Sequence, residues 1–200
     1  MFKGKILIVI SHWDDESLLM GGFLKKYGRG AVVVCCTIKD WVKDHQGIFN
    51  RICINCGAIP ITLPIHHRVE KWNGKGDIIS FFKQATPIDL FDTLSTKLLT
   101  DNGIDIGDFG TIITHGYDGD LGRHHHHKQV SRFISKVSLD TQDVFNLVNN
   151  PTKDGCIELE LDRSLLEWKS KIISLYFTER KHKVLFRKSE KLELVRKGRV

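Results

Sequence analysis

Two short polar stretches of the sequence contain the residue types that bind metal ions and move protons. The first is residues 11–16 (SHWDDE), and the second runs from Thr114-His115 to four consecutive histidines at 124–127. Histidine and carboxylate side chains are ligands of catalytic zinc sites, which use three protein ligands and keep one position for water. Zinc lowers the pKa of that water to about 7 and so supplies hydroxide at neutral pH. Together the two stretches predict a metal-assisted hydrolytic site.

The spacing within the first stretch suits a single ion. His12 and Asp15 are three residues apart at an expected strand-to-helix turn, so one nitrogen and one oxygen can converge. A second histidine from the other stretch completes a set of two histidines and one carboxylate. Asp14, next to the ligand, is a suitable base for the water. His115, at the end of the other strand, either supports the site from outside the ligand set or packs as an ordinary core residue.

Each stretch also has a simpler interpretation. Acidic residues after a strand can cap a helix and occupy its first turn, where the helix dipole favours negative charge. Four consecutive histidines can form a surface tract without a function. Because both stretches follow apolar runs that are typical of buried strands, we retain the site as the interpretation.

The elements that must bring these side chains together alternate between apolar strands and helices. Apolar strands are expected at 5–10, 31–38, 59–63 and 110–114, with a half-buried strand at 157–161. Helices are expected at about 18–27, 43–56, 86–100, 126–137 and 164–177. Strands without polar alternation, separated by helices, are typical of a parallel sheet covered on both faces. In such sheets ligands bind at the carboxyl ends of the strands, where both polar stretches begin. We expect one α/β domain over residues 1–200.

The net charge of +6 raises the question of a nucleic-acid partner. Nine of the 30 basic and three of the 24 acidic residues lie at 179–200, so residues 1–178 carry 21 of each and are neutral. In this basic segment, short strands are expected at 184–186 and 192–195, with Lys and Arg on a solvated face. A basic nucleic-acid-binding protein with a vestigial metal site is the alternative from another class, and a steep loss of binding with added salt would identify it. The segment carries no RNA-binding or zinc-finger motif, so a nucleic acid is not the expected partner.

The start of the sequence bears on the cellular location. Its apolar run, Ile6–Ile10, is far shorter than the roughly 20 residues of a membrane span. The polar residues 11–16 follow where a signal peptide would continue its apolar region. We therefore expect a cytoplasmic protein without a membrane span.

The five cysteines do not indicate a disulfide framework, because their number is odd and the chain is not small. Cys53 and Cys56 form a CxxC motif, which fits a redox pair or half of a zinc site. Ile48, Ile52 and Cys56 fall at helical spacing, which favours a third interpretation, in which the cysteines are small buried side chains.

Residues 6–24 (ILIVISHWDDESLLMGGFL) resemble the N-terminal motif of the PIG-L/LmbE-like deacetylases, in which an apolar strand runs into (P/A)HPDDE and a glycine pair. Residues 111–130 (TIITHGYDGDLGRHHHHKQV) are similar to the later block of that family, a strand ending in Thr-His followed by HPDH and a helix. Residues 169–176 are similar to its late helix, which carries a Lys and a Tyr. The resemblance implies a Rossmann-like, mostly parallel α/β sheet with helices on both faces and short C-terminal strands.

The resemblance also implies a role for each residue of the site. His12 and Asp15 match the first two metal ligands, and His127 matches the third, with Zn²⁺ as the expected ion and Fe²⁺ as another choice. Asp14 matches the general base. His124 matches the histidine that stabilises the oxyanion or protonates the leaving amine.

The sequence departs from the family pattern within the histidine tract. His125 and His126 replace the Pro-Asp of HPDH, so His126 is an alternative to His127 as the third ligand. Trp13 replaces a proline in the first motif, which changes the turn but none of the ligands.

The function implied by the resemblance is that of a metal-dependent amide hydrolase which removes an acetyl group from an N-acetylglucosamine-type substrate. The expected partner is a small acetylated amino-sugar conjugate. The alternative within this class is the same metal hydrolase acting on another acylated small molecule or on a nucleotide. A homo-oligomeric state stays open.

Overall fold

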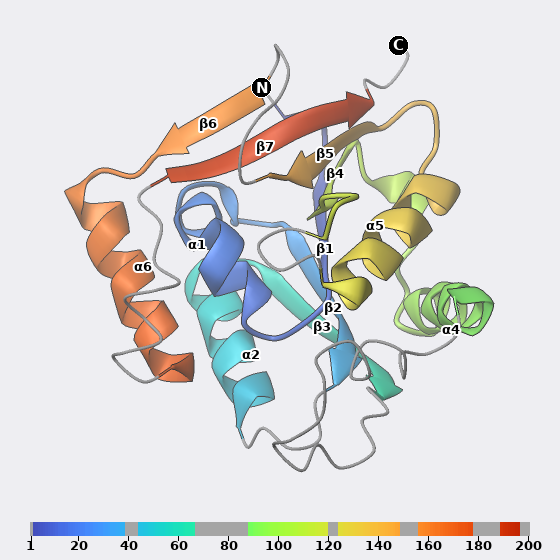
Figure 1. Cartoon of the computed structure of the whole chain (residues 1–200), viewed down its shortest axis with the longest axis horizontal. Coiled ribbons are helices and arrows are strands. Elements are labelled where there is room, and N and C mark those ends of the chain that lie inside the picture. Colours follow the sequence, from blue (N-terminus) through green and yellow to red (C-terminus); the bar gives the residue numbers. More distant parts are fainter. Residues whose placement is uncertain are drawn as a thin grey trace.

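The computed structural model describes residues 2–38, 44–66, 88–119, 124–148, 156–177 and 189–196, which contain seven strands and five α-helices (Figure 1). The strands are β1 (Ile6–Ile10), β2 (Val32–Ile38), β3 (Ile59–His66), β4 (Thr111–His115), β5 (Asp143–Leu147), β6 (Cys156–Glu160) and β7 (Ser189–Arg196). The helices are α1 (Asp15–Tyr27), α2 (His45–Asn55), α4 (Ile88–Asp101), α5 (His125–Val137) and α6 (Arg163–Tyr176), with a 3₁₀ turn η1 (Ile106–Asp108). No helix in these ranges is long and apolar enough to cross a membrane.

All seven strands belong to one mixed sheet. Its strand order is β3-β2-β1-β4-β5-β7-β6, and β1 to β5 run parallel. β7 is antiparallel to both of its neighbours, β5 and β6. The structure therefore confirms the expected α/β class with a mostly parallel sheet. The continuous apolar runs explain this arrangement, because strands buried on both faces have no polar alternation.

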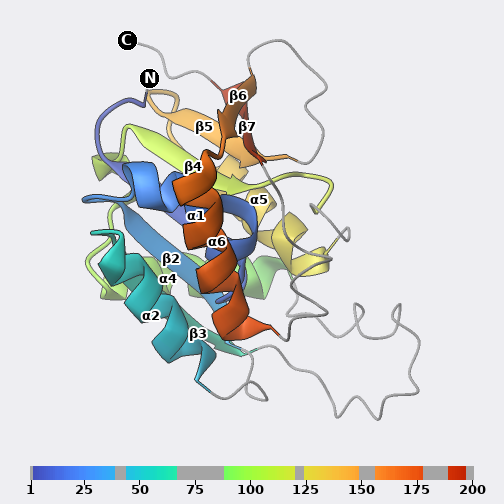
Figure 2. The same cartoon turned by 90° about the vertical axis from the view of Figure 1, so that its left-hand side faces the viewer.

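Two apolar cores lie on opposite faces of the sheet. Ile8 and Ile10 of β1 pack in the core that includes residues of α1 and α2, whereas Leu7 and Val9 pack in the core that includes residues of α4 and α5. Alternate residues of a strand point to opposite faces, so one short strand contributes to both cores. Figure 2 shows α1, α2 and α6 together on the first face. This buried scaffold fixes the positions at which the strands end and their loops begin.

The sequence pattern does not predict β5. Asp143 and Asn146 interrupt its apolar residues, so the segment shows neither a continuous apolar run nor a strict alternation. Asn146 is nevertheless buried, because β4 and β7 pair with β5 on its two sides.

β7 confirms the strand expected at 192–195 and shows its pairing. It lies between β5 and β6, so it is an interior strand of the sheet. Glu190 is buried, and the half-buried Lys191 places its ammonium 3.2 Å from the carboxylate of Glu158. The strand expected at 184–186 lies outside the described residues.

Helix α1 is broken in its middle, and β7 and α6 stabilise the break. Met20 has non-helical dihedral angles (φ −147°, ψ 26°). The backbone N–H groups of Gly22 and Phe23 donate to the two carboxylate oxygens of Glu190 at 2.9 and 2.6 Å. Lys169 of α6 donates to the same carboxylate at 2.7 Å, and both charged side chains are buried. Glu190 therefore caps the second half of α1 as an N-cap residue would, and Lys169 balances its charge.

The glycine pair after this break lets α6 and its preceding segment approach α1 closely. A Cβ on Gly21 would lie 2.8 Å from Cδ1 of Ile172, and a Cβ on Gly22 would lie 2.3 Å from Cδ2 of Leu161. Both distances are too short for non-bonded carbon atoms, whose favourable separation is about 3.5–4.0 Å. A side chain at either position would therefore displace the end of the Ile172 or Leu161 side chain.

Candidate metal centre

The turn after β1 positions two of the predicted ligands. The N–H of Asp15 donates to the carbonyl oxygen of His12 at 3.2 Å, and α1 begins at Asp15. In return, Oδ2 of Asp15 accepts the backbone N–H of His12 at 2.7 Å. These two bonds hold the side chains of His12 and Asp15 next to each other, and both side chains are buried.

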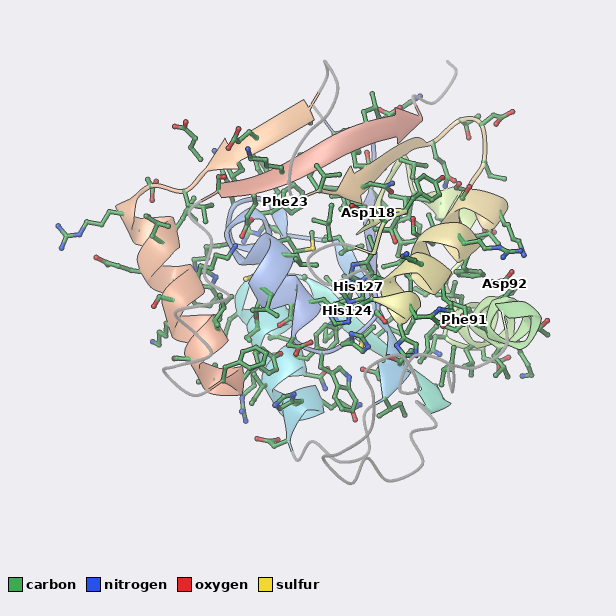
Figure 3. All side chains as sticks on the ribbon, in the orientation of Figure 1. Phe23, Phe91, Asp92, Asp118, His124 and His127 are labelled. Atoms are coloured by element: carbon green, nitrogen blue, oxygen red, sulfur yellow. The ribbon has the colours of Figure 1, made fainter. Side chains whose placement is uncertain are left out.

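The end of β4 and the start of α5 bring the histidine tract to this turn. β1 and β4 pair in parallel with Val9 opposite Thr114, and the hydroxyl of Thr114 donates to the carbonyl oxygen of Val9 at 3.0 Å. The carboxyl ends of the two strands are therefore neighbours. Helix α5 begins at His125, and Figure 3 shows His124 and His127 side by side at this end of the helix.

Donor atoms of three residues from these elements converge, and each histidine lies close to a different oxygen of Asp15. Nδ1 of His12 lies 3.4 Å from Oδ2 of Asp15 and 3.4 Å from Nε2 of His127, which in turn lies 3.4 Å from Oδ1 of Asp15. Within the described ranges, these three buried residues form a group that could hold a metal ion. In a tetrahedral zinc site with bonds of about 2.0–2.1 Å, two neighbouring ligand atoms are about 3.3–3.4 Å apart. The spacing and the donor types therefore fit a metal ion with three protein ligands.

The electrostatics of Asp15 also suit a cation. Burial raises the pKa of this carboxyl, but the neighbouring His127 and His12 and the hydrogen bonds with His115 and His12 together lower it by more, so the pKa lies well below its usual value. Asp15 is therefore ionised at neutral pH, which is the form that a metal ion binds.

The structure separates the two candidate third ligands within the histidine tract. His127 belongs to the converging group, whereas His126 meets the ring of His12 edge-on with the ring centroids 5.5 Å apart. Both side chains are buried. The geometry favours the register in which His127 supplies the third donor atom.

The two predicted catalytic residues flank the converging group. Asp14 is the N-cap residue of α1, is half-buried, and makes no capping hydrogen bond with its side chain. His124 is the N-cap residue of α5, and its ring centroid lies 4.8 Å from that of His127. The roles of Asp14 as a base and of His124 as an acid or oxyanion donor stay predictions.

A buried link joins the site to α6, whose similarity to the family's late helix did not indicate this contact. The hydroxyl of Tyr176 donates to Oε1 of Glu16 at 2.9 Å. Burial raises the pKa of Glu16 well above its usual value, and burial beside Glu16 raises the pKa of Tyr176 as well. Because Glu16 directly follows Asp15, this bond ties the first turn of α1 to the last turn of α6. No local signal reveals the pair, since its members are 160 residues apart.

The CxxC motif is separate from this group. Cys53 is fully buried in the core on the α1 and α2 face, and neither Cys53 nor Cys56 forms a disulfide. Burial raises the pKa of both thiols, to about 11 for Cys56. Both are therefore protonated at neutral pH, which confirms Cys53 as a small buried side chain and argues against a redox or zinc role.

The mixed sheet and the His-Asp-His group at its carboxyl edge define a Rossmann-like α/β protein with a candidate metal centre. Comparison with solved structures shows that this is the fold of the PIG-L/LmbE-like deacetylases. No protein-family model matches the sequence, and no curated protein matches it significantly.

Deacetylases are among the similar structures. N,N'-diacetylchitobiose deacetylase from Pyrococcus horikoshii is 12% identical with a TM-score of 0.65, and the match covers 96% of this chain and 83% of that one. The zinc-inhibited form of teicoplanin deacetylase Orf2 is 12% identical with a TM-score of 0.59, and the match covers 94% and 96%. Identities this low establish a shared fold and leave the reaction to be argued from the site.

A third similar structure is that of a hydratase, an enzyme with a different reaction. The 4-carboxy-2-hydroxymuconate hydratase from Pseudomonas putida is 12% identical with a TM-score of 0.55, and the match covers 92% of this chain and 83% of that one. The fold thus supports a hydratase as well as deacetylases.

Proposed function

We propose that the protein is a metal-dependent amide hydrolase that removes an acetyl group from an N-acetylglucosamine-type substrate. The observation that carries the proposal is the convergence of His12, Asp15 and His127, with donor atoms 3.4 Å apart, at the carboxyl edge of a sheet with a deacetylase fold. Three ligands leave room for water in the coordination sphere, which is the arrangement of a hydrolytic centre.

Each side chain has a defined task in this reaction. His12, Asp15 and His127 would hold the metal ion, which supplies Lewis-acid activation of water and of the acetyl carbonyl group. Asp14 would accept the proton of the attacking water. His124 would stabilise the negative charge on the former carbonyl oxygen or protonate the leaving amine, so that acetate and the free amine are the products.

The identity of the metal is part of the proposal. Two imidazoles and one carboxylate suit Zn²⁺, and imidazole also binds Fe²⁺. One solved deacetylase of this fold is described as zinc-inhibited, so excess zinc must be avoided when the activity is measured. We propose Zn²⁺ as the resident ion and Fe²⁺ as the alternative.

The test combines metal analysis with acetate release. The purified protein is treated with a chelator, reloaded with one equivalent of Zn²⁺ or Fe²⁺, and offered a panel of N-acetylglucosamine conjugates, other N-acylated small molecules and an acylated nucleotide. We expect one bound ion per chain and acetate release that requires it. The absence of bound metal together with the absence of acetate from the whole panel would reject the proposal, and hydration of an unsaturated acid without acetate release would favour the hydratase reaction.

The structure describes the side chain of one of the nine basic residues at 179–200. This residue, Lys191 of β7, lies 3.2 Å from the carboxylate of Glu158. Binding of DNA or RNA that weakens steeply with added salt would support the nucleic-acid alternative instead. The cytoplasmic location, the single domain and the oligomeric state stay predictions.

Asp14→Asn should lower the turnover number by about 10²–10⁴-fold, the usual contribution of a general base. The bound metal should stay at the wild-type level, because Asp14 lies outside the converging group. The measurement is the turnover number together with the metal content of the same preparation. Asp108→Asn, an exposed aspartate in η1, is the matched control and should leave both values unchanged. Full activity in Asp14→Asn would reject Asp14 as the base.

A further inference from the structure

His115 is a further buried ring at the candidate metal centre, and the proposed reaction gives it no task. It ends β4, and its side chain is inaccessible to solvent. Its ring lies flat on that of His127, with the centroids 3.8 Å apart and the planes 13° apart. Its Nε2 atom lies 3.3 Å from Oδ2 of Asp15. By distance alone, His115 could therefore be taken for a fourth metal ligand.

The hydrogen bond from Ser11 assigns it another role. The backbone N–H of Ser11 points at Nε2 of His115 with a nitrogen–nitrogen distance of 2.9 Å. A backbone N–H can only donate, so Nε2 accepts and carries no proton. The lone pair of Nε2 is thus engaged by the N–H of Ser11 and is not directed at a metal ion.

We infer that His115 is a positioning residue of the metal centre, an inference that rests on the metal site of the proposed function. One face of its ring supports His127 of α5, and its edge holds Ser11, the residue before His12. A single rigid ring therefore sets two ligands from different elements relative to each other. Because His115 stays outside the ligand set, the centre has three protein ligands and an open position for water.

His115→Gln separates the two parts of this role. Glutamine can place an oxygen acceptor near the position of Nε2, so the Ser11 N–H keeps a partner and the turn can form, but the flat ring against His127 is lost. Residues that orient metal ligands typically contribute about 10–100-fold to metal affinity, and we expect a loss of this size for Zn²⁺. The dissociation constant is measured without substrate, by competition with a chromophoric chelator. The visible spectrum of the Co²⁺-loaded protein should keep the wild-type band pattern, because the ligands are unchanged.

The control is His125→Gln, the same substitution at a half-exposed histidine in the adjacent tract, which should bind Zn²⁺ within about two-fold of the wild type. An unchanged Zn²⁺ affinity in His115→Gln would overturn the inference, and so would a Co²⁺ spectrum that shows the loss of a nitrogen ligand.

If His115→Gln does not fold, His115→Asn, which cannot reach Ser11 in the same way, is compared with His115→Phe, which keeps a flat ring. Tighter Zn²⁺ binding by the phenylalanine variant supports the ring contact, and equal binding rejects it. A wild-type protein that binds no metal would reject the proposed function itself.

Discussion

Asp15→Asn should abolish metal-dependent acetate release. Asparagine keeps the size of the side chain and an oxygen that can accept the N–H of His12, so the turn after β1 should still form. The negative charge, which the low pKa of Asp15 maintains at neutral pH, is lost. A metal ion supplies several kcal/mol of transition-state stabilisation, so we expect acetate release to fall by about 10³-fold or more. The measurement is acetate release and metal content after reloading with one equivalent of ion.

The matched control is Asp101→Asn, which removes a carboxylate from the exposed pair with Lys97 on α4. An exposed pair of this kind contributes less than about 1 kcal/mol to stability, so activity and metal content should stay at the wild-type level. Wild-type metal content in Asp15→Asn would show that Asp15 is not a ligand. Loss of metal with unchanged acetate release would instead show that the ion is not needed for the reaction.

The second large effect concerns stability. Lys169→Met leaves the carboxylate of Glu190 buried without its cation, although the N–H groups of Gly22 and Phe23 still donate to it. Breaking a buried pair in this way costs about 3–5 kcal/mol of unfolding free energy. For a chain of this size the loss corresponds to a decrease in Tm of about 10 °C. Urea and thermal unfolding followed by circular dichroism measure both quantities.

A double-mutant cycle separates the pair from its surroundings. Lys169→Met combined with Glu190→Gln removes both charges, and the amide oxygen of glutamine can still accept one N–H of α1. We expect the double variant to be more stable than Lys169→Met alone, since the unpaired charge is gone. Lys171→Met, at an exposed lysine of the same helix, is the control and should change stability by less than about 0.5 kcal/mol. A cost below about 1 kcal/mol for Lys169→Met would contradict this account of the pair.

The sequence predicts those strands whose burial is visible in a local pattern of apolar residues. β1, β2 and β4 are continuous apolar runs because both of their faces are buried, and this property is visible in the sequence alone. β5 does not follow the rule, because its polar Asn146 is buried between two partner strands. The interior position of β7 depends on pairing with strands that precede it by tens of residues, and no local pattern encodes that pairing.

The candidate site divides in the same way. His12 and Asp15 belong to one turn, so their spacing predicts that they lie close together, and the strand before the histidine tract predicts its approach. The supporting contacts join residues that are far apart in the sequence, so no spacing between neighbouring residues predicts them. The bond from Tyr176 to Glu16 and the stacking of His115 on His127 become visible only when distant elements are placed together.

The capping of α1 by Glu190 has a consequence for the time course of folding. The hydrogen bond between Glu190 and Gly22 joins residues that are 168 positions apart. Synthesis proceeds from the N-terminus at about 5–20 residues per second, so the helix that begins with Asp15 emerges from the ribosome on the order of 10–30 s before its capping carboxylate exists. During that interval β7 and its buried Lys169–Glu190 pair cannot form. We therefore expect the second half of α1 to stay without its capping carboxylate until β7 has been synthesised and has entered the sheet.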